Sequence, residues 1–476
     1  MTPPTPGAPP LDVAEPIHFI GIGGAGMSVV AMLFLAAGRT VSGSDARAGS
    51  ALDRLAAEGA RVQVGHAAAN VAGAGTVVVS TAVKPDNVEL VAAREAGIPV
   101  LHRSEALALV AAGKDFVAVA GAHGKTTTSS MLAVALRAAG EDPSYAIGGE
   151  VLALGTGAHA GAGRIFVAEA DESDRSFLAY SPRVAVVTNI EADHLDHYES
   201  VEAVHEAFAL FAERIVPDGL LVACSDDPGA ARLAGRVRSR GGRVRTYGAA
   251  PVQGDHVLVR VGELRGDGST ASVSWAPPDA APIEVALELA VAGEHNVLNA
   301  AAAWTAGVDL GVDPRLLADA LGGFTGTSRR FESRGSAGGV RVVDDYAHHP
   351  TEVAALLAQA RLAAAGGRVL ALFQPHLYSR TLAFAGEFAT ALGAADEAVV
   401  TGIYGAREEP RPGVTGALIT DAMAAGGSSA RYVPDRLDAA RTVAALARPG
   451  DLVLTVGAGD VTVLGSAILD ELRGRA

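Results

Sequence analysis

The stretch GAHGKTTT at 121–128 could hold the phosphates of a nucleotide, because Lys125 and Thr126 directly follow a glycine between an apolar run and a helix-forming segment. Glycine lets successive backbone N–H groups face one anion, and the following helix adds a favourable dipole. Lys125 would reach the outer phosphates, and the Thr126 hydroxyl would bind Mg²⁺. The spacing is shorter than in the common P-loop, since Val119 stands where that pattern has glycine. We predict a P-loop variant with a helix from about Ser129.

An earlier stretch, GIGGAGMS, has the spacing of a dinucleotide-binding loop. Gly21, Gly23 and Gly26 satisfy G-x-G-x-x-G, and Asp45 ends the next predicted strand. The pattern requires only a diphosphate on a helix N-terminus and an acid near a ribose. A UDP-sugar meets both requirements as well as NAD does. The loop therefore predicts a nucleoside diphosphate and leaves its identity open.

Acidic and histidine-rich runs follow two further predicted strands, at 169–174 (EADESD) and 189–198 (NIEADHLDHY). Ligands bind beyond the carboxyl ends of parallel strands, so these groups can converge on a metal that also binds the phosphates. The first candidates and their neighbours are Glu169 and His194, then Asp171, Asp193 and Asp196. Carboxylate, hydroxyl and imidazole ligands without a thiolate favour Mg²⁺ or Mn²⁺ over zinc.

Two later runs, DDYAHHP at 344–350 and QPHLYSR at 374–380, also place polar and aromatic groups just past predicted strands. A lone histidine is usually structural, but His348, His349 and His376 together at strand ends indicate a further site.

The elements that must position these residues form three α/β series. Apolar runs typical of buried parallel strands lie at 17–22, 40–45, 76–81 and 98–102, at 116–125, 164–171, 184–194 and 219–227, and at 340–346, 368–376, 397–404 and 451–460. RGDGS between VLVRVGEL and TASVSWA predicts a β-hairpin, and FTGTSRRF at 324–331 predicts a connector that could act as a hinge. We predict a disordered tail (1–15) and three domains (16–113, 114–325 and 326–476).

The composition fits a globular protein that acts on small anions. Of 476 residues, 49% are hydrophobic and 19% charged, and the formal net charge of −15 argues against general attraction to nucleic acid or anionic membranes. The single cysteine, Cys224, excludes an intrachain disulfide, is expected to be a buried apolar residue and favours a reducing cytoplasm. The sequence offers no signal peptide and no window of the roughly 18 apolar residues that a membrane helix needs.

The motifs, in this order, resemble those of the Mur ligases. The resemblance rests on GIGGAGMS, STAV, GAHGKTTT, EADESDRSF, NIEADHLDHY, GEHNVLNAAAA, TSRRFE, DDYAHHPTE and QPHLYSRT, which span nearly the whole chain. It implies a Rossmann-like UDP-binding domain, a central P-loop ATPase-like α/β domain and a Rossmann-like C-terminal domain that binds the amino acid. It also implies that ATP phosphorylates the lactoyl carboxylate of UDP-N-acetylmuramate and that L-alanine displaces the phosphate to form an amide, in peptidoglycan precursor synthesis.

The resemblance also implies residue roles. For catalysis it implies Lys125, Glu169, His194, His348 and Arg380. For ATP it implies Gly121, Ala122, His123, Gly124, Lys125, Thr126, Thr127, Asn296, Asn299, Arg329, Arg330, Asp344 and Asp345. For the UDP substrate it implies Gly23, Gly24, Ala25, Gly26, Met27, Ser28, Asp45, His66, Ser80 and Thr81. For the amino acid it implies Tyr346, His348, His376 and Arg380, and for Mg²⁺ or Mn²⁺ it implies Thr126, Glu169 and His194.

Departures from the family pattern indicate which type of Mur ligase this chain resembles, and several other functions have to be weighed against it. Ala122 stands where many relatives have threonine, and no lysine follows Lys125, whereas later-acting Mur ligases carry a carbamylated lysine there. This favours the alanine-adding type. A murein tripeptide ligase, which uses the same sugar nucleotide in recycling, stays an alternative. Folylpolyglutamate synthetase lacks the first loop, an NAD-dependent oxidoreductase leaves the P-loop unexplained, and a non-catalytic nucleotide-binding module leaves Glu169 and His194 unexplained.

Overall fold

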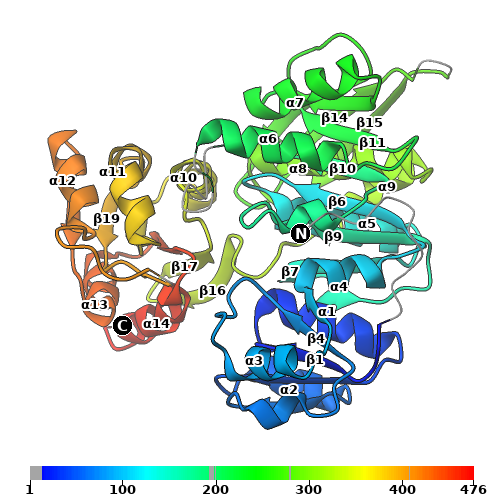
Figure 1. Cartoon of the computed structure of the whole chain (residues 1–476). Coiled ribbons are helices and arrows are strands. Elements are labelled where there is room, and N and C mark those ends of the chain that lie inside the picture. Colours follow the sequence, from blue (N-terminus) through cyan, green and yellow to red (C-terminus); the bar gives the residue numbers. More distant parts are fainter. Residues whose placement is uncertain (1–12, 192–197, 199, 278–279, 407, 476) are drawn as a thin grey trace. The chain divides into compact units, whose positions relative to one another are not determined.

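The computed structural model describes residues 13–191, 198, 200–277, 280–406 and 408–475, which form three sheets flanked by helices (Figure 1). Contacts divide the chain into two compact units. The first unit is Met1–Arg260, Ser272–Leu287 and Leu298–Phe324, and the second is Val261–Ala271, Glu288–Val297 and Thr325–Ala476. The predicted connector therefore begins at the border between the two units.

The first sheet is parallel, with strand order β3-β2-β1-β4-β5. Its elements are β1 (Ile17–Ile20), α1 (Ala25–Ala36), β2 (Val41–Asp45), α2 (Ser50–Ala57), β3 (Arg61–Val64), η1 (Ala68–Val71), β4 (Thr76–Val79), α3 (Val88–Glu95), β5 (Val100–His102) and α4 (Arg103–Val110). All four residues of β1 are buried, as expected for a central strand that is covered on both faces. The strand order reverses between β1 and β4, and ligands of such sheets bind at this switch point.

The second sheet has ten strands in the order β15-β14-β13-β12-β11-β10-β6-β9-β7-β8. Its strands are β6 (Asp115–Ala120), β7 (Ser144–Val151), β8 (Thr156–His159), β9 (Ile165–Glu169), β10 (Val184–Val187), β11 (Leu220–Cys224), β12 (Arg243–Gly248), β13 (His256–Leu264), β14 (Ser269–Trp275) and β15 (Ile283–Leu289). The helical segments around it are α5 (Lys125–Ala138), η2 (Ser176–Ala179), α6 (Val201–Ala212), α7 (Pro228–Ser239), α8 (Glu294–Asp309) and α9 (Pro314–Leu321). Strand β6 pairs in parallel with both β9 and β10, so the segments that follow these three strands emerge at one edge.

The third sheet has the order β16-β17-β21-β18-β19-β20, and only its β16–β17 pair is antiparallel. Its elements are β16 (Glu332–Ala337), β17 (Val340–Asp345), α10 (Pro350–Ala364), β18 (Val369–Phe373), α11 (Tyr378–Leu392), β19 (Glu397–Val400), α12 (Ala417–Ala425), β20 (Ala430–Tyr432), α13 (Arg436–Leu446), β21 (Leu452–Val456), η3 (Asp460–Val463) and α14 (Leu464–Arg473). Alternate β18 residues enter two separate cores: Ala371 and Phe373 pack with α10 and α11, while Leu370 and Leu372 pack with α13 and α14.

Most local predictions agree with the structure. Arg265 N donates to Gly268 O at 2.9 Å in the turn that joins β13 to β14, which confirms the hairpin. Cys224 is buried, as predicted, and burial raises the pKa of its thiol to about 11. The predicted start of a helix at about Ser129 is wrong: α5 begins at Lys125, because Gly124 at φ +83° ends the loop there.

Two predictions concern the chain's start and its hydropathy. Residues 1–12 of the predicted tail lie outside the described residues, whereas Glu15 accepts a hydrogen bond from Thr40 N at 2.8 Å. Among the described residues, none of the helices has the length and apolar character that a membrane crossing requires.

Candidate nucleotide and amino-acid sites

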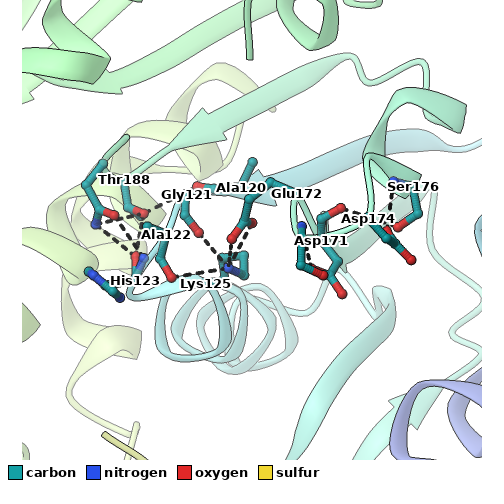
Figure 2. Close-up of polar contacts among 12 residues, drawn as sticks. Ala120, Gly121, Ala122, His123, Lys125, Asp171, Glu172, Asp174, Ser176 and Thr188 are labelled. Atoms are coloured by element: carbon teal, nitrogen blue, oxygen red, sulfur yellow. Dashed lines mark hydrogen bonds and ion pairs between the residues drawn. The ribbon is translucent and has the colours of Figure 1, made fainter. Parts of the chain in front are cut away.

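The loop between β6 and α5 folds around the ammonium group of Lys125 (Figure 2). The Nζ atom donates to Gly121 O at 2.6 Å and to Ala122 O at 3.3 Å, and it lies 2.9 Å from Glu172 Oε1. The ammonium group of Lys125 is therefore held against the backbone of its own loop, where phosphate oxygens could replace these acceptors.

Glu172 and Lys125 form a buried charge pair. Burial raises the pKa of Glu172 to about 7, although the neighbouring Lys125 opposes this rise. Burial alone would lower the pKa of Lys125, but the carboxylates of Glu172, Asp171 and Glu169 raise it above its ordinary value. Lys125 is therefore charged at neutral pH, as a phosphate ligand must be. The sequence pattern missed Glu172, because four carboxylates in EADESD look alike without coordinates.

Glycine is required twice in this loop. Gly121 and Gly124 have φ values of +136° and +83°. A Cβ atom on Gly121 would clash with the Thr188 hydroxyl, and one on Gly124 would lie 2.7 Å from Asn299 Oδ1. Asn299 also accepts a hydrogen bond from Thr128 Oγ1 at 3.2 Å. Asn299, predicted to bind ATP, thus supports the first turn of α5, which also contains Thr126 and Thr127.

The end of β10 fixes the same loop from its other side. Asn189 Oδ1 accepts from His123 N at 2.8 Å, and Asn189 Nδ2 donates to His123 O at 3.0 Å. The Thr188 hydroxyl donates to His123 O at 2.6 Å (Figure 2). The predictions did not include Thr188 or Asn189, although Asn189 is the first residue of the strand-end motif that contributed His194 and Thr188 directly precedes it.

Two predicted metal ligands lie against one short segment of β7. Glu169, at the end of β9, accepts from Gly148 N at 2.8 Å. A Cβ atom on Gly149 would lie 3.3 Å from Thr126 Cγ2. A carboxylate and a hydroxyl beside a phosphate loop are the donors that Mg²⁺ prefers, so Glu169 and Thr126 fit this ion. His194, with Asp193 and Asp196, lies outside the described residues.

The first glycine loop is held by the acid that was expected to bind a ribose. Asp45 Oδ2 accepts from Gly23 N at 3.0 Å, so this carboxylate supports the loop itself. Gly24 is the N-cap of α1, whose first residues are Ala25, Gly26, Met27 and Ser28. Met27 is buried with 3% exposure and contributes to the core.

The remaining predicted UDP-site residues lie after β3 and β4. His66 follows β3, and its Nδ1 lies 2.9 Å from Ser44 Oγ. Ser80 and Thr81 follow β4 directly.

Contacts within the first unit join the first loop to the acidic run. Arg103 Nη2, at the start of α4, lies 3.6 Å from Asp171 Oδ2. A Cβ atom on Gly26 would clash with the same guanidinium group. The hydroxyl of Thr81 donates to Asp174 Oδ2. The first loop is therefore linked to the acidic run, whose Glu172 contacts Lys125 of the P-loop. Arg103 is a cation that the predictions did not include.

In the second unit, the four predicted amino-acid-site residues form one continuous group. The Tyr346 and His348 rings lie 5.2 Å apart between centroids, and the His348 and His376 rings lie 5.7 Å apart. Arg380 Nη1 lies 3.4 Å from His376 Nδ1. The ring of Tyr404, which the predictions did not include, stacks on His376 at 5.9 Å.

A partly buried acid, Glu352, and the backbone carbonyl of Tyr346, 3.0 Å from His348 Nδ1, together orient His348 in this group. Glu352 Oε2 lies 3.1 Å from His348 Nδ1 and accepts from His348 N at 2.9 Å. The other predicted histidine of this run, His349, is the N-cap residue of α10.

Several residues predicted to bind ATP also lie in the second unit. Asp344 is fully buried and accepts from Arg329 Nε at 3.1 Å and Thr455 Oγ1 at 2.6 Å. Burial raises the pKa of Asp345 to about 6, against the effect of Arg330. Asn296 Nδ2 donates to Ala292 O at 2.8 Å. These contacts anchor the connector and the start of α8, and they leave the ATP roles of these residues as predictions.

Comparisons with known proteins cover nearly the whole chain. The profile described as "Mur ligase family, catalytic domain" matches residues 16–115. The profiles "Mur ligase middle domain" and "Mur ligase, glutamate ligase domain" match residues 119–307 and 329–459. These three matches agree with the predicted α/β class of three domains.

Several relatives are more than half identical to the chain over nearly its whole length. The UDP-N-acetylmuramate–L-alanine ligase of Kineococcus radiotolerans is 57% identical over 462 residues, covering 96% of each chain. The protein of the same name from Renibacterium salmoninarum is 56% identical over 456 residues, again covering 96% of each.

Solved structures give the same fold. The UDP-N-acetylmuramate–alanine ligase of Thermotoga maritima is 29% identical, with a TM-score of 0.78 over 97% of this chain and 99% of its own. A murein peptide ligase from Psychrobacter arcticus is 26% identical, with a TM-score of 0.71 over 96% and 98%. With three family domains in order and relatives of 56% and 57% identity along its length, the chain belongs to the Mur ligase family.

Proposed function

We propose that this protein is an ATP-dependent ligase that joins L-alanine to UDP-N-acetylmuramate through an acyl phosphate, in peptidoglycan precursor synthesis. The observation that carries the chemistry is a series of contacts from the first loop to the P-loop. Arg103 lies against Gly26 and Asp171, and Glu172 of the same acidic run lies 2.9 Å from Lys125 Nζ. The names of the relatives at 56% and 57% identity support the choice of L-alanine and UDP-N-acetylmuramate. ATP and nucleotide sugars are cytoplasmic metabolites, so we place the reaction in the cytoplasm.

In the first half-reaction, an oxygen of the lactoyl carboxylate attacks the γ-phosphorus of ATP, and ADP leaves. Both reactants are anions and repel each other strongly away from water. Lys125 would donate to phosphate oxygens in place of the loop carbonyls that it contacts in the structure. The N-terminus of α5 would add partial positive charge. Thr126 and Glu169, with the predicted ligand His194, would hold Mg²⁺ or Mn²⁺, which would neutralise further charge on the phosphates.

In the second half-reaction, the amine of L-alanine attacks the acyl carbon, and inorganic phosphate leaves. Arg380 would pair with the carboxylate of L-alanine through a charge-assisted contact. His348, oriented by Glu352, lies beside His376 and could accept the proton that the ammonium group must lose. The rings of Tyr346 and His376 would border the methyl side chain.

A murein tripeptide ligase is the second candidate, because the structure from Psychrobacter arcticus shares the fold over nearly all of both chains. Both candidates use ATP and the same sugar nucleotide, and they differ only in the amine. The amine dependence of ADP release therefore separates them.

The test is ADP release from the purified protein with ATP, Mg²⁺ and UDP-N-acetylmuramate, with one amine added at a time. We expect release with L-alanine, weaker release with glycine or L-serine, and none with the tripeptide L-alanyl-γ-D-glutamyl-diaminopimelate. Omission of the sugar nucleotide or of the metal should abolish release. Turnover with the tripeptide and none with L-alanine would replace this assignment by the recycling function.

A further inference from the structure

Glu89, on α3, lies fully buried beneath the first sheet and is surrounded by hydrogen-bond donors. Its Oε1 atom accepts from Ala67 N at 3.1 Å and from Asn70 Nδ2 at 2.5 Å. Its Oε2 atom accepts from Ser44 Oγ at 2.5 Å and lies 3.4 Å from His18 Nε2 and 3.5 Å from His66 Nδ1. Burial opposes its ionisation, but these hydrogen bonds hold the pKa of Glu89 at about 2. The carboxylate is therefore charged at neutral pH.

The same network determines which nitrogen of His66 carries a proton. The hydroxyl of Ser44 has one hydrogen, and it donates that hydrogen to Glu89. Ser44 Oγ must then accept its other hydrogen bond, so the proton in its 2.9 Å contact with His66 belongs to Nδ1. A neutral imidazole with a proton on Nδ1 has a lone pair on Nε2. His66, whose side chain is 25% exposed, then offers an acceptor to a ligand.

We propose that Glu89 is a positioning residue that acts through Ser44 to present Nε2 of His66 as a hydrogen-bond acceptor for an N–H or O–H donor on the nucleoside part of the substrate. This inference rests on the proposed function, in which His66 belongs to the UDP site. Glu89 also fixes the backbone beside His66 through Ala67 N, so one buried charge sets both the place and the tautomer of the imidazole.

Glu89→Gln gives a sharp test, because its amide can take only one orientation in this network. The amide oxygen must face the two donors Ala67 N and Asn70 Nδ2, which leaves the amide NH₂ facing Ser44. Ser44 would then accept from Gln and donate to Nδ1 of His66. The imidazole proton would move to Nε2, and a donor would face the substrate's donor.

We expect Glu89→Gln to raise KM for UDP-N-acetylmuramate and Kd for UDP about tenfold. The values of kcat and of KM for ATP and L-alanine should stay within about twofold. Ser44→Ala removes the relay but leaves Glu89 Oε2 3.5 Å from His66 Nδ1, so it should weaken UDP binding less, about fivefold. Ser42→Ala is the matched control. Ser42 Oγ, on the same strand, lies 3.0 Å from His18 Nδ1 and is connected to Glu89 through His18 rather than through Ser44, so UDP binding should be unchanged.

Two further measurements separate positioning from a merely structural role. In ¹⁵N-histidine spectra, His66, assigned by loss of its signals in His66→Ala, should be the Nδ1–H tautomer in the wild type and the Nε2–H tautomer in Glu89→Gln. In the His66→Ala background, Glu89→Gln should cause no further loss of UDP affinity.

Three outcomes would overturn the inference: an Nε2–H tautomer in the wild type, unchanged UDP affinity in both Glu89→Gln and Ser44→Ala, or equal losses with and without His66. Should Glu89→Gln fail to fold, the UDP affinity of Ser44→Ala and the His66 tautomer in the wild-type spectrum still test the relay. Wild-type protein that binds no UDP would overturn the UDP site itself. Normal UDP binding by the wild-type protein, with the same UDP affinity in Glu89→Gln and Ser44→Ala, would overturn only the relay.

Discussion

Lys125 and Glu172 form a buried ion pair that keeps the ammonium group proposed to bind phosphate charged and in place. The ammonium group lies 2.9 Å from a carboxylate with 2% exposure, and two loop carbonyls complete its contacts. Removal of one member of such a pair leaves the other charge buried without compensation, which costs more than the pair contributes. The pair therefore couples the chemistry of the loop to the stability of the central domain.

Lys125→Met should lower kcat about 1,000-fold and destabilise the fold in a pH-dependent manner. Without Lys125, the folded pKa of Glu172 should rise further above its unfolded value. Such a carboxyl stabilises the fold while it is protonated, and this contribution is lost as the pH rises through the folded pKa. Urea unfolding should show little loss at pH 5 and a loss of about 2 kcal/mol at pH 8.

The double variant Lys125→Met, Glu172→Gln is the control for this prediction. It should recover the stability at pH 8, because the uncharged amide at position 172 needs no buried cation beside it. It should stay inactive, because Lys125 is still missing. Equal losses at both pH values in the single variant would show that Glu172 does not titrate as proposed.

The sequence predicted the residues whose chemistry is visible in a short motif, and it missed those that act through contacts. Lys125 and Thr126 follow from the glycine loop alone. Arg103 and Tyr404 have no motif of their own, and only the fold brings Arg103 to Asp171 and Tyr404 to His376. Asp45 fits the dinucleotide pattern, but its carboxylate accepts from Gly23 N, a contact that spacing cannot reveal.

At the scale of elements, the order of three strands assembles the nucleotide loop. Because β6 lies between β9 and β10, the P-loop, the acidic run and the Thr188–Asn189 turn leave the sheet side by side. Each segment could be predicted to follow a strand. The strand order could not be predicted, because it depends on crossovers that local apolar patterns do not specify.

Asn189→Ala tests the support that β10 gives to the loop. The variant loses two hydrogen bonds to the backbone of His123, so the loop should be less ordered before ATP binds. We expect KM for ATP to rise about tenfold, with KM for UDP-N-acetylmuramate unchanged.

Asn87→Ala is a matched control for this variant, since Asn87 Oδ1 also accepts from two backbone N–H groups, at the start of α3. That variant should lose about 1 kcal/mol of stability and keep its KM for ATP. If the two variants have the same KM for ATP, the contact to His123 has no role in nucleotide binding.

Two strands that the predictions missed, β3 and β7, lack the continuous apolar run on which the predictions relied. Three residues of β3 (RVQV) are exposed, and β7 (SYAIGGEV) changes from buried to exposed at its glycine pair. Neither segment is a continuous apolar run. The exposed half of β7 nevertheless carries Gly148, whose N–H group binds Glu169, so a strand that the pattern missed supports a predicted metal ligand.

At the scale of the whole molecule, the loops proposed for phosphoryl transfer and the group proposed to bind L-alanine belong to different units, although several residues predicted to bind ATP lie in the second unit as well. The anion loops and the acidic run belong to the first unit, and the group of Tyr346, His348, His376 and Arg380 belongs to the second. Acyl-phosphate formation should therefore be separable from amide formation by substitution in the second unit.

Arg380→Ala tests this separation. With 5% exposure, Arg380 is held in place, and its loss should raise KM for L-alanine about 50-fold through the missing carboxylate contact. Acyl phosphate can be trapped by hydroxylamine as the hydroxamate, which requires no amino-acid site. Hydroxamate formation from ATP and UDP-N-acetylmuramate should stay within about threefold of the wild-type rate, whereas Lys125→Met should abolish it. Loss of hydroxamate in a folded Arg380→Ala protein would mean that Arg380 takes part in phosphoryl transfer, and the assignment of this residue to the amino-acid site alone would be wrong.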